Sequence, residues 1–419
     1  MITIKNKSTS FLYILFQFIA IFVIFDGIRS NMIGGAIISV LRELTVLFLL
    51  CYALFIKKFP YKKIFSQTLL LFIAYHTIIC IFTILFQPDY TSALILKPYS
   101  LIISIYIFQY FEEITHRTYQ DYIRFIVQVS IIFVIFNTIF YFIPAPFLIE
   151  QKLWWGRISV SYPTMDVVTL SYVLILLMYY PNIKISSTKR ILYMSILILG
   201  IFIQFSGTGI VLIGGIFISF IYYVLFSSQK TLKKETLVLV SIIILTSGSV
   251  ISYLKIKFPD EYNKGFDLIE NKISILSGDI GDNEFNTMDA RQNAIEDVKR
   301  KYINNSFSKI FGIGLGHATN NLSKLNKNKS LFMIEDQYSL ISICYGYIGL
   351  FLFSLTIILF ALKSLKSQLP TNLKIMFICA AFIFAANSKT LTSLILFPNY
   401  VFIAFFFTLI KKEIYAYHY

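Results

Sequence analysis

Apolar stretches of about 20 residues, the length that a helix needs to cross the hydrocarbon of a bilayer, recur along nearly the whole of this 419-residue chain. Only 14% of the residues are charged, whereas a soluble domain carries about 25% charged residues. The pattern leaves no room for a separate soluble catalytic domain. It predicts an all-α integral membrane protein with about twelve transmembrane helices and a large outer loop that contains short helices.

The hydropathy pattern also locates the individual spans. Their predicted ranges are 11–28, 36–56, 65–86, 92–111, 122–143, 165–181, 190–205, 209–226, 236–254, 337–361, 373–387 and 393–410. The first apolar run, Phe11–Phe25, lacks a small-residue cleavage site, which favours a span over a cleavable signal peptide. The four cysteines all fall inside apolar runs, so we interpret them as small core residues rather than disulfide or metal partners.

The distribution of positive charge predicts the side of the membrane on which each loop lies. Lys and Arg gather in the segments that face inward if the N-terminus is cytoplasmic. The short outer loops hold only Arg29, Lys152, Arg157 and Lys389. Because cytoplasmic loops are enriched in Lys and Arg, both termini are expected in the cytoplasm. The net charge of +15 is therefore mainly a topology signal, and we expect no binding of nucleic acid.

Two outer segments are too long to be turns. The smaller covers residues 144–164, between spans of the 1–254 region. The larger covers residues 255–334 and precedes the last spans and the tail, in 335–419. We expect these two segments to carry the function, because the remaining outer connections are short.

The larger outer segment contains FGIGLGHATNN (Phe311–Asn321), with glycines at alternate positions. Such glycines often cradle phosphate, but GIGLGH lacks the Lys-Ser/Thr ending of a P-loop and follows no strand of a βαβ unit. The loop also faces away from cytoplasmic ATP. These features exclude a nucleotide site, and the glycines are expected to serve close backbone approach and tight bending.

Five charged residues inside the predicted spans lie in the outer half of the membrane. They are Asp26, Arg42, Glu43, Lys97 and Asp166. Each is costly there and marks a functional site by default. Alternatively, each reaches the interface or pairs with a neighbour, as Arg42 could with Asp26. As a group they predict a cationic pocket in the outer leaflet, suited to an anionic lipid headgroup such as a diphosphate.

The outer segments supply further candidates. A helix is predicted over residues 286–303, with an apolar stripe formed by Met288, Ile295, Val298 and Tyr302. Arg291 lies on this stripe, either in a structural ion pair or as an anion ligand held over the pocket. In the smaller segment, Trp154 and Trp155 stand close to Arg157 and are either interface anchors or stacking surfaces for sugar rings.

Four segments in this order resemble the O-antigen polymerase and ligase superfamily, the Wzy-type integral-membrane glycosyltransferases. GRISVSYP (Gly156–Pro163) is similar to the arginine loop of that family. FSGTG (Phe205–Gly209) is similar to its Ser-rich break between two central spans, with Gly207 where the family usually has Arg. ARQNAIEDV with FGIGLGH resembles its large-loop helix and glycine element, and EDQYSLISICYGYIGL (Glu335–Leu350) resembles the entry to its next span. The resemblance covers residues 11–410.

The resemblance implies a GT-C-like glycosyltransferase architecture in the bacterial inner membrane, with a periplasmic active site. It implies an O-antigen polymerase, which transfers the growing glycan from undecaprenyl diphosphate to the non-reducing-end sugar of a new lipid-linked repeat unit. The implied reaction inverts the anomeric centre and needs no metal or other cofactor. The expected partners are undecaprenyl-diphosphate-linked oligosaccharides and membrane lipids, and a chain-length regulator protein is a further candidate.

Inverting transfer needs a base at the acceptor hydroxyl and positive charge at the departing diphosphate. The candidate bases, in order of preference, are Glu335, Asp336 and His317. The candidate diphosphate ligands are Arg157 and Arg291, supported by Arg42 and Lys97. The candidate sugar-binding residues are Trp154, Trp155 and Tyr338. His317 has two alternative roles, as a bond to the diphosphate or as a cap of its loop.

Two other functions stay open. Ligases of the superfamily pass finished glycan to lipid A core and have a histidine where this chain has Glu335, so the acidic residue favours a polymerase. A transporter of lipid-linked oligosaccharide also suits many spans with buried charges. Transporters usually consist of two related halves with sites at the midplane, whereas this chain shows no internal repeat and its charges crowd one leaflet.

Overall fold

The structure is a computed structural model, and it describes most of the chain. The described residues are 2–29, 31–56, 67–87, 92–149, 159–160, 163–181, 183, 185–204, 206–226, 287–316, 318–319, 332–333, 337–390 and 397–418, with scattered residues between 248 and 267. They are almost entirely helical, and two-residue strands β1 (Ala318–Thr319) and β2 (Phe332–Met333) pair in parallel.

The helices follow the predicted spans closely. Those within spans are α1 (Ile2–Ile24), α3 (Gly35–Ile56), α4 (Gln67–Phe86), α5 (Ser92–Gln109), α7 (Tyr119–Phe142), α8 (Pro163–Tyr179), α9 (Ser187–Phe202), α10 (Gly207–Phe226), α16 (Gln337–Cys344), α17 (Gly346–Lys366), α18 (Thr371–Thr390) and α19 (Phe397–His418). The others are α2 (Asp26–Arg29), α6 (Phe111–Thr115), α13 (Thr287–Tyr302) and α14 (Ser306–Phe311). The predicted span 236–254 lies almost wholly outside the described residues.

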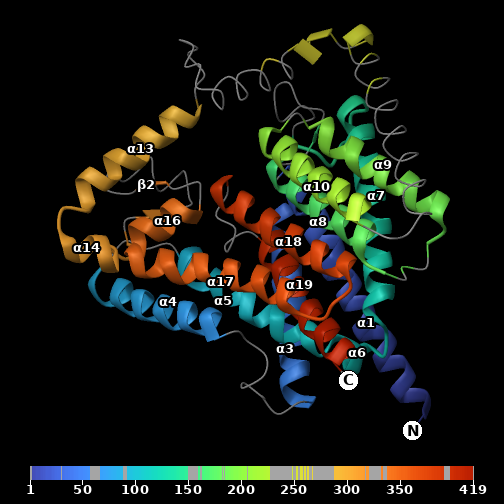
Figure 1. Ribbon diagram of the computed structural model, residues 1–419, viewed down its shortest axis with the longest axis horizontal. Coiled ribbons are helices and arrows are strands. Elements are labelled where there is room, and N and C mark those ends of the chain that lie inside the picture. The colour runs from blue at the N-terminus through green and yellow to red at the C-terminus, as the bar shows by residue number, and fades with distance from the viewer. Residues whose placement is uncertain are drawn as a thin grey trace.

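Helix α8 forms the centre of the bundle. It packs against α9, α10 and α18, and also against α7 and α19 (Figure 1). Every described residue from Asp166 to Leu177 is buried, which explains why this helix is apolar on all sides. Helix α17 packs between α4 and α18, and α5 packs along α19. The start of α1 and the end of α19 lie at the same end of the bundle (Figure 1).

Several helices are suited to cross a membrane. Among the residues that the structure describes, five helices are long and apolar enough by length and composition, and they belong to α3, α4, α7, α17 and α18. Shorter apolar helices lie within α1, α5, α8 and α10. Large apolar side chains such as Phe55, Leu85 and Phe86 point outward, as lipid contact requires. The predicted helical character is confirmed for the described residues, and several helices are long and apolar enough to cross a membrane, while the number of spans stays a prediction.

One predicted span is divided in two. Within the range 337–361, α16 ends at Cys344 and α17 begins at Gly346. Gly346 has a φ of 66°, a left-handed conformation that glycine adopts without strain. The hydropathy of this stretch is continuous, so only the backbone geometry reveals the break.

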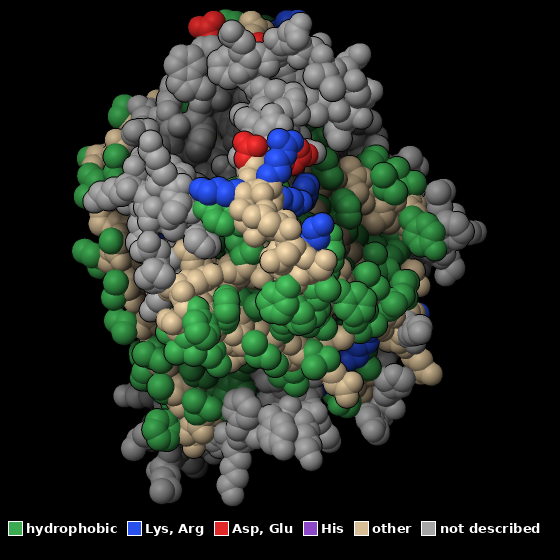
Figure 2. All heavy atoms as spheres, turned by 90° about the vertical axis from the view of Figure 1, so that its left-hand side faces the viewer, with side chains coloured by type: hydrophobic (Ala, Val, Ile, Leu, Met, Phe, Trp, Pro, Cys, Tyr) green, Lys and Arg blue, Asp and Glu red, His purple; other side chains and the backbone are tan. Residues whose placement is uncertain are grey.

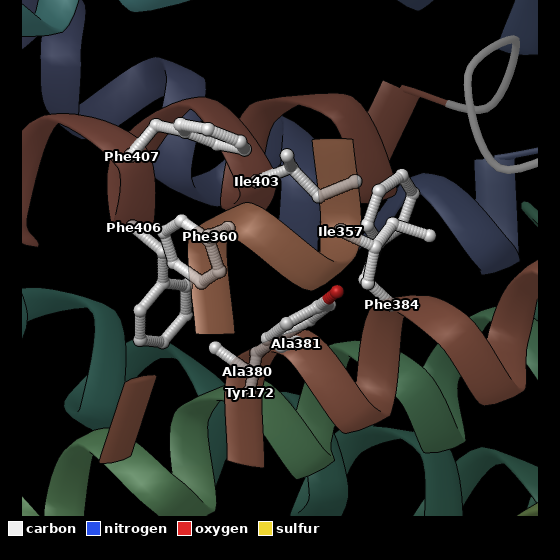
Figure 3. Close-up of a pocket in the computed structure, with 9 residues that line it drawn as sticks. All are labelled: Tyr172, Ile357, Phe360, Ala380, Ala381, Phe384, Ile403, Phe406 and Phe407. Atoms are coloured by element: carbon white, nitrogen blue, oxygen red, sulfur yellow. The ribbon is translucent and has the colours of Figure 1, made fainter. Parts of the chain in front are cut away.

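A small cavity lies in the core between α8, α17, α18 and α19. It measures about 10 Å³ and is lined by Tyr172 and by apolar side chains that include Ile357, Ala381 and Phe406 (Figure 3). This volume suits at most one water molecule, so the cavity is no substrate site. The Tyr172 hydroxyl is buried there and has no hydrogen-bond partner among the residues that the structure describes.

The substitution Tyr172→Phe is expected to stabilise the protein by about 1 kcal/mol, because it removes a buried hydroxyl that makes no hydrogen bond and conserves the ring. Thermal unfolding in detergent measures the effect. Tyr122→Phe is the matched control, since the Tyr122 hydroxyl is also buried but donates to the Phe16 carbonyl oxygen at 3.1 Å. We expect this control to lose stability. Equal losses from both variants would show that the Tyr172 hydroxyl is satisfied.

Candidate functional site

Charged side chains of α2, α3 and α5 meet at one end of the bundle. Arg42 donates to Asp26 Oδ1 at 2.6 Å and to Glu43 Oε1 at 2.7 Å. Glu43 Oε1 also accepts from Lys97 Nζ at 2.6 Å, and Asp26 Oδ1 accepts from Arg29 Nε at 2.9 Å. We call Asp26, Arg29, Arg42, Glu43 and Lys97 the ion-pair network. It lies at the end where α1 finishes and where α3 and α5 begin, which the charge distribution predicts to be the outer end.

Burial makes the network costly to leave unpaired. Asp26 is 4% exposed and Arg42 is 6% exposed, so each needs an opposite charge. The predicted alternative, in which Arg42 pairs with Asp26, is confirmed. Glu43 reaches both Arg42 and Lys97, and it thereby neutralises much of the positive charge that the sequence suggested for this pocket. The network still holds more basic than acidic side chains.

Asp166, the last of the five charged residues predicted to lie in the outer half of the membrane, is at the start of α8, and α2 packs against this helix. It is 1% exposed and accepts a long hydrogen bond of 3.5 Å from Gln204 Nε2. Gln204 belongs to the short connection between α9 and α10, next to the segment that resembles the Ser-rich break of the superfamily. The connection that carries Gln204 therefore adjoins the start of α8, the same helix against which α2 packs.

A cavity of about 220 Å³ opens beside the network, between α1, α2 and α3. Its wall combines the charged side chains of Asp26, Arg29 and Arg42 with apolar side chains. The apolar part consists of Ile21, Phe22, Phe25, Met32 and Ile38. Sequence reasoning counted Arg29 only as a loop charge. Arg29 follows Asp26 by three residues, a spacing that places both side chains on one face of a helix. This spacing could have indicated that Arg29 belongs to the same site.

The smaller outer segment is fastened next to this end of the bundle. Asn31 Nδ2 donates to the Val160 carbonyl oxygen at 2.8 Å, and the Val160 N–H donates to Asn137 Oδ1 at 2.9 Å. Ser159 and Val160 are both fully buried. Arg157 precedes Ser159 by two residues in the sequence. The candidate residues Arg157, Trp154 and Trp155 themselves lie outside the described residues.

The alternate glycines allow close backbone approach, as predicted. Gly312 and Gly314 both have a φ of 80°. A Cβ on Gly312 would lie 2.3 Å from the Cys344 carbonyl oxygen, and one on Gly316 would lie 2.4 Å from Gln87 side-chain atoms. No side chain fits at these distances. The glycines thus let the loop pack directly on the end of α4 and on residues 343–346, where α16 meets α17. We call these residues the joint of α16 and α17.

Hydrogen bonds complete this packing. The N–H groups of Ile313 and Gly314 donate to the carbonyl oxygens of Ile343 and Cys344, each at 3.1 Å. Gln87, directly after α4, donates from Nε2 to the Ile313 carbonyl oxygen at 2.6 Å and accepts from the Gly316 N–H at 2.5 Å. The loop is therefore bound to two helices that are far apart in the sequence.

The predicted loop helix is α13. Of its predicted apolar stripe, Ile295, Val298 and Tyr302 are partly buried against the core, which confirms the helix and the orientation of this part of the stripe. Arg291 belongs to α13, but its side chain lies outside the described part of the structure. Four further candidates lie close to α13 in the sequence, and the structure describes only one of them. Glu335, Asp336 and His317 lie outside the described residues, whereas Tyr338 of α16 is described.

Tyr338 is half-buried, and its ring meets that of Phe353 edge-on with centroids 5.7 Å apart. Glu335 and Asp336 immediately precede α16, whose first residue, Gln337, is 2% exposed. Among the candidates, the structure thus brings Arg42 and Lys97 together through Glu43.

His76 is a buried polar residue that sequence reasoning missed. It is fully buried in α4, and its ring nitrogens lie 2.7 Å from the Tyr345 hydroxyl and 2.9 Å from the Ile95 carbonyl oxygen. Ile95 is two residues from Lys97 on α5, so His76 connects the joint of α16 and α17 to the helix that carries part of the ion-pair network. Asp26 was selected because it is a charged residue inside a predicted span. His76 would also have been selected if the search had included histidine, which is ionisable.

No protein-family model matches this chain, and no curated protein matches it. Within the described parts of the chain, no group of three or more His, Cys, Asp or Glu side chains is arranged to hold a metal ion.

Proposed function

We propose that this chain is an O-antigen polymerase that transfers a growing glycan from undecaprenyl diphosphate to the non-reducing-end sugar of a new lipid-linked repeat unit. The observation that supports this most strongly is the cavity beside the ion-pair network. Its apolar walls and its two guanidinium groups suit a ligand with a hydrocarbon chain and an anionic headgroup. A polyprenyl diphosphate has both parts, whereas a free sugar or a nucleotide has no need of apolar walls.

The proposed ligands of the diphosphate differ in how strongly carboxylates of the protein already bind them. Arg42 is held by two carboxylates, so its proposed role is to keep the site positive rather than to reach the phosphates. Arg29 is 27% exposed along its side chain and lines the cavity, so it is added to the proposed contacts. Arg157 and Arg291 are proposed to complete the site. The anchoring of Ser159 and Val160 beside Asn31 supports this for Arg157.

The proposed reaction is a single displacement. A hydroxyl of the acceptor sugar attacks the anomeric carbon of the donor glycan, the bond to the diphosphate oxygen breaks, and undecaprenyl diphosphate leaves with the electron pair. Glu335 is the proposed base that takes the hydroxyl proton, with Asp336 and then His317 as the alternatives. Trp154, Trp155 and Tyr338 are proposed to bind sugar rings. Lys97 supports the positive side of the site through Glu43.

The remaining parts of the proposal concern the membrane. The chain is proposed to cross the bacterial inner membrane about twelve times in a GT-C-like architecture, with both termini in the cytoplasm and the site facing the periplasm. The common end of α1 and α19 supports this placement of the termini (Figure 1). The bond between the glycan and the diphosphate supplies the free energy of transfer, so the proposed reaction uses no nucleotide, and it is also proposed to need no metal.

Arg157→Ala and Arg291→Ala test the proposed diphosphate site in cells that lack their own copy of the protein. Each is expected to slow transfer by about 10²–10³-fold, because it removes charge stabilisation at the leaving group. The glycan ladder on gels should then collapse to single repeat units. Arg300→Ala is the matched control, since Arg300 is exposed on α13 and only 3.9 Å from Glu296 in a surface pair. It should keep the full ladder.

Full ladders from both variants would remove these arginines from the mechanism. Loss of all attached glycan in the deletion strain, instead of collapse to one unit, would identify a ligase. For the base, the test is whether Glu335→Gln or Asp336→Asn abolishes the ladder. Retained activity in both variants would leave neither carboxylate as the base.

A further inference from the structure

The segment Ser306–Gly316 consists of α14 and the loop that contains Gly312, Gly314 and Gly316. It lies alongside α4, not beyond the end of that helix. The Tyr75 hydroxyl donates to the Phe311 carbonyl oxygen at 3.0 Å, and the Leu315 N–H donates to Thr83 Oγ1 at 2.9 Å. Gln87 then binds Gly316. At a rise of 1.5 Å per residue, the twelve residues from Tyr75 to Gln87 correspond to about 18 Å along the helix axis. The segment therefore follows about half of a helix that is long and apolar enough to cross the membrane.

The backbone of this segment is satisfied by protein groups, as a position inside a bilayer demands. Consecutive N–H groups find acceptors in Ser308, Ile343, Cys344, Thr83 and Gln87. The carbonyl oxygens of Phe311 and Ile313 accept from Tyr75 and Gln87 side chains. The start of α14 is capped by Asn305, whose side chain accepts from the Ser308 N–H at 2.8 Å. A loop in water would not need partners of this kind.

The outward side of the same segment is apolar and exposed. Phe307 is 67% exposed, and its ring packs against that of Phe311, which is 40% exposed, with centroids 4.8 Å apart. Tyr347 and Phe351, in the first turns of α17, are 61% and 63% exposed. Helix α14 packs on α17. We call Phe307, Ile310, Phe311, Tyr347 and Phe351 the aromatic face.

The aromatic face continues a surface that already suits lipid. The outer end of α4 exposes Leu85 and Phe86. Figure 2 shows the side of the molecule that carries α13, α14 and α4, and there a broad band of hydrophobic side chains lies below a group of charged ones. Lys301, in the last turn of α13, and Lys309, in α14, are both exposed. Positive side chains beside an apolar band complement the phosphates of lipid headgroups.

We infer that Ser306–Gly316 is a re-entrant membrane segment, and that its aromatic face binds phospholipid acyl chains while Lys301 and Lys309 contact the lipid phosphates. This part of the large outer loop is then seated in the leaflet on the side of the ion-pair network instead of standing above it. This inference concerns the bilayer and does not depend on glycosyl transfer.

A spin label reports the depth of the segment in the full-length protein in vesicles of phosphatidylcholine and phosphatidylglycerol. The background variant is Cys51→Ser, because Cys51 is exposed while Cys80, Cys344 and Cys379 are buried. Phe307→Cys then carries a nitroxide, with Leu85→Cys as the lipid-facing control and Arg300→Cys as the aqueous control. Oxygen dissolves in hydrocarbon and a nickel chelate stays in water, so the collision rates with the two reagents locate each label.

We expect the label at position 307 to collide more with oxygen than with nickel, as at position 85, and the order to be reversed at position 300. Nickel access at 307 equal to that at 300 would place α14 in water and overturn the inference. Exclusion of both reagents, with a short distance between labels of two molecules, would show that a second copy of the chain covers the face, which also overturns it.

The phosphate contact has its own test with the same vesicles. Spin-labelled phosphatidylglycerol should be immobilised at the protein surface more than spin-labelled phosphatidylcholine, and the variant Lys309→Gln with Lys301→Gln should lose this preference. Equal immobilisation of both lipids by the unmodified protein would remove the phosphate contact and leave only the acyl-chain contact.

Discussion

Asp26→Asn is expected to destabilise the protein by about 3–5 kcal/mol, because it leaves the buried guanidinium of Arg42 without its closest carboxylate. The amide would keep the shape of the original side chain, so the loss reports charge and not packing. Arg29 would lose the same partner, but it is partly exposed and adds less. Thermal unfolding in detergent measures the change, and the glycan ladder measures its consequence for activity.

Two further variants separate this effect from a general sensitivity to substitution. Asp297→Asn changes an exposed carboxylate on α13 and is expected to leave stability unchanged. Asp26→Asn combined with Arg42→Met removes both charges of the buried pair, and it should recover much of the lost stability. An Asp26→Asn protein as stable as the original would contradict the ion-pair network as a structural element.

Gly312→Ala is the second change with a large expected effect, of about 2–6 kcal/mol. The residue has a φ of 80°, and the added methyl group would lie 2.3 Å from the Cys344 carbonyl oxygen. The loop would have to move away from the joint of α16 and α17, and the hydrogen bonds from Ile313 and Gly314 to that joint would break. We expect a lower unfolding temperature together with loss of the glycan ladder, since Glu335 and Asp336 directly precede α16.

Gly214→Ala is the matched control for Gly312→Ala. A Cβ on Gly214, in the middle of α10, would meet no atom within 4 Å. Alanine also has the higher helix propensity, so this variant should be neutral or slightly more stable, by up to about 1 kcal/mol. Equal behaviour of the two variants would mean that the loop at Gly312 adapts without cost, against the geometry described above.

The helices could be predicted from the sequence because each of them has a local pattern of residues. A run of apolar residues marks a span wherever the helix lies in the bundle, and the cap-type residue Thr287 marks the start of α13. The break at Tyr345 left no such trace in hydropathy, because α16 and α17 are both apolar. Only a backbone angle, at Gly346, distinguishes two helices from one.

The candidate site was harder to predict because it depends on contacts between helices. The sequence shows that Glu43 and Lys97 share a depth, but it does not show that α3 and α5 stand side by side and place them 2.6 Å apart. For the same reason the pocket was expected to be more cationic than it is. The position of Phe311 beside Tyr75 also depends on tertiary packing, so a loop predicted to lie outside the spans is found along a helix that is long and apolar enough to cross a membrane.

The most direct test of the proposed function uses purified protein in vesicles, with an undecaprenyl-diphosphate-linked oligosaccharide as the only substrate, a chelator present and no nucleotide added. We expect a ladder of products with two or more repeat units, and one molecule of undecaprenyl diphosphate released for each new glycosidic bond. Substrate that stays as single units, or that crosses the bilayer without being joined, would contradict it.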